Sequence, residues 1–177
     1  MALGQRSRFG KISISEQIGI LPYSYELTKE TLSANIRIRV NSKACNGCLS
    51  CVTNCSMVNE MYISLIAARI QVELDPFGGQ NKIFLCRQCG KAPCMTVCQP
   101  GAILREPEGK LVIDYLLCDN CKAYIEACPF QAIFWNPKTG RVLKCELCQG
   151  EQKCVMVCPT GALKIHAVSE TVMEEER

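Results

Sequence analysis

Fifteen cysteines among 177 residues constrain the fold of this chain more than any other feature of its sequence. They fall into four blocks, three with four cysteines and one with three. A motif that recurs at roughly 30–40 residues indicates a repeat architecture. So many thiols, with few aromatic residues, indicate that metal or disulfides help to hold the fold together. The blocks are Cys45, Cys48, Cys51 and Cys55; Cys86, Cys89, Cys94 and Cys98; Cys118, Cys121 and Cys128; and Cys145, Cys148, Cys154 and Cys158.

Disulfides are the less favoured use of these thiols. The cysteine count is odd, and residues 1–40 contain no apolar segment of the kind found in a secretory signal. We therefore expect a cytoplasmic location, where thiols stay reduced. The apolar runs are far shorter than the ~20 residues needed to span a bilayer, so no membrane span is expected. The basic residues are scattered rather than striped, so no nucleic-acid binding is expected either.

The spacing within the blocks favours iron–sulfur clusters over zinc. A C-x2-C-x2-C loop can place three thiolates around one face of a cubane cluster, and in two-cluster ferredoxins the last cysteine of each run binds the partner cluster. Three blocks continue past their last cysteine, Cys98, Cys128 or Cys158, with similar segments. Structural zinc sites join two C-x2-C pairs and do not need this ending. A structural zinc-binding interaction module is the alternative from a different class of protein.

Short strands and helices are predicted around the blocks. Alternating or β-branched runs predict strands, and short helices are expected within residues 92–98 and 152–158. Units of this size predict an α+β fold of modules that have pseudo-twofold symmetry and each enclose two clusters. The predicted strands are residues 36–40, 70–74, 111–113, 132–135, 142–143 and 162–165.

The four blocks resemble those of the four-cluster, ferredoxin-type electron-transfer subunits that accompany molybdenum- and tungsten-pterin oxidoreductases. The resemblance covers about residues 36–167. The five-residue gap between Cys148 and Cys154 is similar to that in the small subunits of tungsten aldehyde oxidoreductase-type enzymes, such as class II benzoyl-coenzyme A reductase. The resemblance implies bacterial dicluster ferredoxin-like modules and a subunit that is not an enzyme by itself.

The resemblance also implies which cysteines share a cluster. In that family the first block pairs with the fourth and the second with the third, and each block gives its last cysteine to its partner's cluster. Carried over to this chain, set one is Cys45, Cys48, Cys51 and Cys158; set two is Cys55, Cys145, Cys148 and Cys154; set three is Cys86, Cys89, Cys94 and Cys128; and set four is Cys98, Cys118 and Cys121.

Tyr124 stands where set four would have its fourth cysteine. A phenol, with a pKa of about 10, is a hard oxygen donor and a poor substitute for a thiolate on iron. Three thiolates suit a [3Fe-4S] cluster, which relatives with an aromatic residue at this place carry; alternatively the site is vacant and Tyr124 packs into it. An oxygen-ligated [4Fe-4S] cluster is a third alternative. The expected cofactors are three [4Fe-4S] clusters, with the fourth site [3Fe-4S] or vacant.

The expected domain organisation follows the pairing of the blocks. One module consists of residues 36–75 and 140–168, and the other consists of residues 76–139. Residues 1–35 form an N-terminal extension, for which we expect docking on a partner, and residues 169–177 form an acidic tail.

Bound clusters change the charge of the chain. The formal net charge is +3 with neutral thiols, whereas a [4Fe-4S] core with four thiolates carries about −2. Basic residues beside the blocks either offset this negative charge or are solvated surface. They are Lys43, Arg87, Lys91, Lys122, Lys144 and Lys153.

No motif predicts a reaction within the chain itself. The sequence has no Walker loop and no G-x-G-x-x-G fingerprint, and its one histidine, His166, has no partner motif. We expect an electron relay to or from a large catalytic subunit with a tungsten or molybdenum pterin, and a further electron donor or acceptor protein. A free-standing polyferredoxin shuttle is the alternative with the same chemistry.

Overall fold

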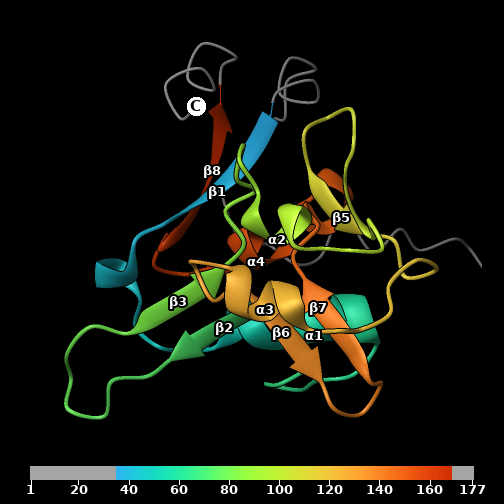
Figure 1. Ribbon diagram of the computed structural model, residues 1–177. Helices are drawn as coiled ribbons and strands as arrows, with labels where there is room; N and C mark the ends of the chain where they lie inside the picture. The colour runs from blue at the N-terminus through green and yellow to red at the C-terminus, as the bar shows by residue number, and fades with distance from the viewer. Residues whose placement is uncertain (1–34, 169–177) are drawn as a thin grey trace, which may run out of the picture.

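Short antiparallel strand pairs form the framework of the fold in this computed structural model, which describes residues 35–168 (Figure 1). The predicted N-terminal extension, apart from Asn35, and the predicted acidic tail lie outside the described residues. Within them, each strand pairs with one other. The strands are β1 (Asn35–Val40), β2 (Ile70–Glu73), β3 (Lys82–Leu85), β4 (Ile103–Arg105), β5 (Leu111–Ile113), β6 (Ile133–Asn136), β7 (Arg141–Lys144) and β8 (Leu163–Val168).

Each cysteine block contains or leads into a short helix. Pro93 opens the helix of the second block at its first position, where the missing N–H breaks no helical hydrogen bond. Two 3-10 turns, η3 (Ser42–Ala44) and η4 (Leu147–Gly150), lie in the first and fourth blocks. The helices are α1 (Ser50–Glu60), α2 (Pro93–Thr96), α3 (Ala123–Ala127) and α4 (Lys153–Met156).

The two ends of the described chain lie side by side. Strands β1 and β8 pair antiparallel, with Ile38 opposite Ile165 (Figure 1). Helix α1 packs against α4 in the same half of the molecule. The first and fourth cysteine blocks are therefore neighbours, although most of the chain separates them in sequence.

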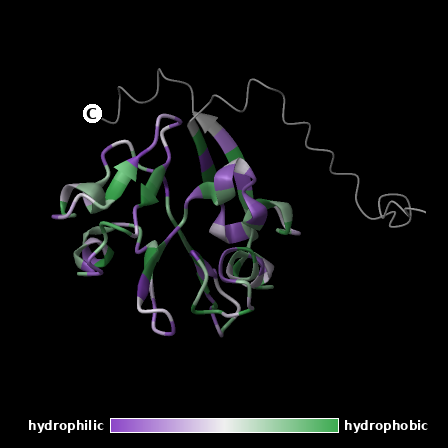
Figure 2. Ribbon diagram, turned by 90° about the vertical axis from the view of Figure 1, so that its right-hand side faces the viewer, coloured by the Kyte–Doolittle hydropathy of each residue, from purple (hydrophilic) through white to green (hydrophobic). Residues whose placement is uncertain are grey.

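The second and third blocks are neighbours in the same way. Helix α2 packs against α3, and the hairpins β4–β5 and β6–β7 flank them. Ile103, Leu111 and Val142 form a buried cluster with Tyr124 in this part of the molecule, while a separate cluster contains residues of the first and fourth blocks. Hydrophobic and hydrophilic stretches alternate along the chain on both sides of the molecule (Figure 2).

The β2–β3 hairpin connects the first block to the second. Ile70 pairs with Leu85 at its base, and both side chains are buried. The two residues pack in the core of the first and fourth blocks, whereas Phe77 in the turn is 96% exposed. The hairpin thus anchors the start of the second block against the core that the first block builds.

Candidate metal centres

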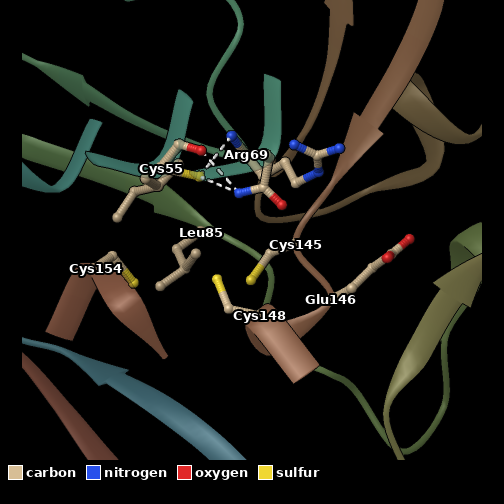
Figure 3. Close-up of a pocket in the computed structure, with 9 residues that line it drawn as sticks. Cys55, Arg69, Leu85, Cys145, Glu146, Cys148 and Cys154 are labelled. Atoms are coloured by element: carbon tan, nitrogen blue, oxygen red, sulfur yellow. Dashed lines mark hydrogen bonds between the residues drawn. The ribbon is translucent and has the colours of Figure 1, made fainter. Parts of the chain in front are cut away.

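The four cysteines of set two surround one cavity. Their sulfur atoms face a common space (Figure 3), which has an empty volume of about 310 Å³ including its opening. Cys55 comes from α1, Cys154 from α4, and Cys145 and Cys148 from the segment that contains η4. The structure therefore brings thiols of the first and fourth blocks together, and three of the four are buried.

Set one surrounds a second cavity, of the same empty volume. Cys45, Cys48, Cys51 and Cys158 line it. The pKa of Cys51 is raised to about 12, first by burial and then by the negative charges of the other three. Such closely placed thiolates repel one another unless positive charge lies between them. The iron atoms of a cluster supply that charge, so the donor set fits the group.

Set three forms where α2 and α3 meet. Burial raises the pKa of Cys94 to about 11; Lys144 opposes this rise, and Cys86 and Cys128 add to it. The pKa of Cys89 is raised by burial and then by the same two cysteines. The last cysteine of the third block therefore lies with three cysteines of the second.

The hydroxyl of Tyr124 lies among the cysteines of set four. The side chain is fully buried, and its Oη is 3.1 Å from Cys118 Sγ. Burial raises the pKa of Tyr124 strongly, and the hydrogen bond with Cys118 and the charges of Cys118, Cys121 and Cys98 raise it further. The phenol thus contacts Cys118 and lies near the other two cysteines of the incomplete set.

Sets one and two each surround a cavity rather than a single point. Between residues 35 and 168, no three Cys, His, Asp or Glu side chains lie close enough together to share one metal ion. In a cubane cluster, four thiolates bind the cluster as a whole rather than one atom. The spread of the sulfur atoms around the two cavities suits a cluster of this kind.

Backbone N–H groups donate to the last cysteine of three blocks. A hydrogen bond of this kind stabilises a thiolate, and hydrogen bonds to the sulfurs are one of the factors that set cluster potentials. The donor and acceptor pairs are Arg69 N and Cys55 Sγ at 3.2 Å, Ala102 N and Cys98 Sγ at 3.2 Å, and Ala132 N and Cys128 Sγ at 3.5 Å.

The segment repeated after the last cysteine forms the same turn in three blocks. The third residue after the cysteine donates its N–H to the cysteine carbonyl and has a positive φ. Gly101 and Gly161 adopt φ values of 67° and 64° without steric cost, but Gln131 has φ of 49°. The turn then directs the N–H of Ala102 or Ala132 toward the sulfur.

Replacing Gln131 with glycine is expected to stabilise the protein. Glycine adopts the left-handed conformation without a Cβ clash, so we expect the free energy of unfolding to rise by ~0.5–1 kcal/mol. Guanidinium unfolding of the anaerobic, iron-loaded protein measures this. Gln131→Ala is the control because it keeps the Cβ; an equal gain in that variant would contradict the explanation.

A family model described as a 4Fe-4S dicluster domain matches residues 83–168. The thiosulfate reductase electron transfer subunit PhsB of Salmonella typhi is 30% identical over 148 residues, which cover 76% of this chain and 77% of that protein. The polyferredoxin-like subunit of the aliphatic sulfonate oxidoreductase of Pyrococcus furiosus is 34% identical over 140 residues, or 77% and 80%. The chain belongs to this family of ferredoxin-like electron-transfer subunits.

A solved structure also resembles this ferredoxin-like subunit. It is the active site complex BamBC of benzoyl coenzyme A reductase with benzoyl-CoA, matched with 27% sequence identity and a TM-score of 0.47 over 79% of this chain and 84% of that chain. The family assignment confirms the predicted electron-transfer class and the use of iron–sulfur clusters. None of the helices between residues 35 and 168 is long and apolar enough to cross a membrane.

Two residues of the ferredoxin-like subunit that sequence reasoning missed lie beside the cysteine sets. Arg69 lines the cavity of set two and forms an ion pair with Glu60 at 3.1 Å. Gln88 is buried and donates to the carbonyl of Cys145 at 2.8 Å. Gln88 lies between two cysteines of the second block, but neither residue type indicates burial, so no sequence pattern marked either residue.

Proposed function

We propose that the chain relays electrons through three [4Fe-4S] clusters between a redox partner protein and a large catalytic subunit with a tungsten or molybdenum pterin. The observation that carries this proposal is the gathering of cysteines from the first and fourth blocks, far apart in sequence, around two cavities. Clusters bound there would supply one-electron transfer. The chain itself sets the distances between the clusters, buries them and donates hydrogen bonds to their sulfur ligands.

The contacts between sets support one order along the relay. The negative charge of Cys51 in set one raises the pKa of Cys154 in set two, so these sets adjoin. Cys86 in set three similarly raises the pKa of Cys145 in set two. The proposed order is therefore set one, set two and set three, with the exposed Cys48 at the first end. Electrons enter and leave at the ends of this line.

The fourth site is proposed to hold Tyr124 instead of a cluster. Its fully buried ring fills the space among the three cysteines, and its hydroxyl is within hydrogen-bonding distance of Cys118. The Cys118 thiol therefore contacts the phenol oxygen in the place where it would otherwise bind iron. The relay then ends at the cluster held by set three.

The arrangement of the helices supports two modules with internal twofold pseudo-symmetry. Helices α1 and α4 pack together and carry cysteines of sets one and two. Helices α2 and α3 also pack together; α2 carries Cys94 of set three, and α3 ends at Cys128 of the same set. We retain the proposed modules at residues 36–75 with 140–168 and at 76–139. The N-terminal extension, residues 1–35, is proposed to dock on the catalytic subunit.

Anaerobic purification from the native host tests this function. We expect a brown complex with a large subunit, about 12 iron and 12 acid-labile sulfide per small chain, and tungsten or molybdenum. A colourless protein with zinc would support the interaction module and end the iron–sulfur proposal. Iron and sulfide without a co-purifying large subunit at low salt would support the free-standing shuttle instead.

A further inference from the structure

Lys144 is the one buried member of the six basic residues beside the cysteine blocks, all of which the structure describes. It ends β7, directly before Cys145, and its side chain has no exposed surface. Its Nζ donates to the carbonyls of Leu111 and Cys145. Among the residues that the structure describes, no carboxylate forms an ion pair with it. The ammonium therefore has hydrogen-bond acceptors but no negative partner among residues 35–168.

A second buried side chain completes a hydrogen-bonded ring with Lys144. Gln88 donates through Nε2 to the Cys145 carbonyl at 2.8 Å and accepts from the Leu111 N–H at 2.7 Å. The ring joins the second block, strand β5 and the start of the fourth block. It holds Lys144 in place where the two halves of the molecule meet.

The position of Lys144 places its charge between two cysteine sets. It acts on Cys145 of set two and on Cys94 of set three, lowering the pKa of both thiols against the effect of their burial. A buried charge is unfavourable unless an opposite charge compensates it. A [4Fe-4S] cluster with four thiolates carries about −2, so clusters on both sides would provide that compensation.

We propose that Lys144 is a buried positive charge that raises the reduction potentials of the clusters held by sets two and three. The inference rests on the proposed function and assigns a residue to the step between the two halves. Each reduction adds one electron and no proton to a cluster, so a fixed cation nearby stabilises the reduced form. Because both sets lie beside the charge, it raises both potentials and changes the difference between them less than either potential.

Lys144→Gln tests the charge while keeping a hydrogen-bond donor. The test uses the full-length protein, isolated anaerobically with its clusters. We expect the one-electron reduction equilibrium of the clusters of sets two and three to become about tenfold less favourable, which lowers each potential by about 59 mV. Potentiometry followed by electron paramagnetic resonance measures it. Lys144→Arg keeps the charge and should retain the wild-type potentials. Lys91→Gln, an exposed lysine of the second block, is the matched control and should change them little because water screens it.

Gln88→Glu provides an independent test without removing the lysine. The new carboxylate would face Lys144 in the ring and cancel its charge, so the same two potentials should fall. Unchanged potentials at full iron content in Lys144→Gln or Gln88→Glu would overturn the proposal. Loss of iron in Lys144→Gln but not in Lys144→Arg would show that cluster binding needs the positive charge, which supports the proposal. Altered potentials or loss of iron in Lys144→Arg would overturn the proposal. Wild-type protein without iron and sulfide would instead refute the proposed function.

Discussion

Replacing Cys55 with alanine and replacing Cys154 with alanine are expected to remove the same cluster. Both thiols line the cavity of set two, although they belong to different blocks. Each variant should lose about four of about 12 iron atoms. Cys51→Ala, one helical turn before Cys55 on α1, should remove the cluster of set one instead. Iron analysis and the electron paramagnetic resonance spectrum of the reduced, anaerobic protein distinguish these results.

The control for these substitutions is Val155→Ala. Val155 follows Cys154 on α4 and packs against the same core without contributing a thiol. It should keep all of its iron, at a modest cost in stability. A spectrum of Cys55→Ala that matched Cys51→Ala and differed from Cys154→Ala would mean that Cys55 binds the cluster of its own block. The prediction that each block gives its last cysteine to its partner's cluster would then be wrong. Loss of set two should also stop electron transfer between the two ends, because this set lies between sets one and three.

Tyr124→Cys is expected to add a fourth cluster. The substitution removes the ring that fills set four and supplies the missing thiolate beside Cys118, so iron should rise by about four atoms per chain. The added cluster should appear as a new signal in the reduced protein. Binding of the added cluster also affects stability. Without it, the loss of the buried Tyr124 ring would lower the free energy of unfolding by about 3–5 kcal/mol.

Tyr124→Phe is the matched control for this change. It keeps the ring but removes the hydroxyl that contacts Cys118 Sγ, and should cost about 1 kcal/mol of stability with no change in iron. A wild-type iron content of about 15, with a gain of one atom in Tyr124→Cys, would mean that the site already holds a three-iron cluster. That result would contradict our assignment of Tyr124 as the occupant.

The cysteine spacing predicted much of the fold because the repeat carries both structure and chemistry. Six strands lie at or near their predicted positions, among them β5 at Leu111–Ile113. Strands β3 and β4 were missed. β4 has only three residues, Ile103–Arg105, and β3, Lys82–Leu85, ends directly at a cysteine block, so neither shows a period long enough to distinguish a strand from a loop.

The short helices predicted within residues 92–98 and 152–158 are confirmed as α2 and α4. The eleven-residue α1, which follows the loop of the first block, was not predicted; its preceding residue, Leu49, has φ of 59°. Lys122 before α3 and Gln152 before α4 are also left-handed. Residues of these types rarely adopt this conformation, so the sequence carries no capping signal that marks where α1, α3 and α4 begin. Tertiary contacts around the cysteines must compensate the strain.

The charged surroundings of the sites could not be read from the sequence either. Lys144 and Lys91 both stand near cysteines in sequence, but one is buried and the other exposed. The difference depends on Leu111 and Gln88, which the fold brings to Lys144 from other segments. Spacing identifies the thiols, whereas burial decides which cation acts on them.

The side-by-side pairing of β1 and β8 has a consequence for biosynthesis. A nascent chain of residues 1–139 already contains every cysteine of set three, but sets one and two still lack thiols from the fourth block. On the proposed cluster assignment, the cluster of set three can be inserted before the fourth block is synthesised, whereas set one is complete only when Cys158 has left the ribosome. A maturation factor that delivered clusters during translation would have to hold the first block open until synthesis ended.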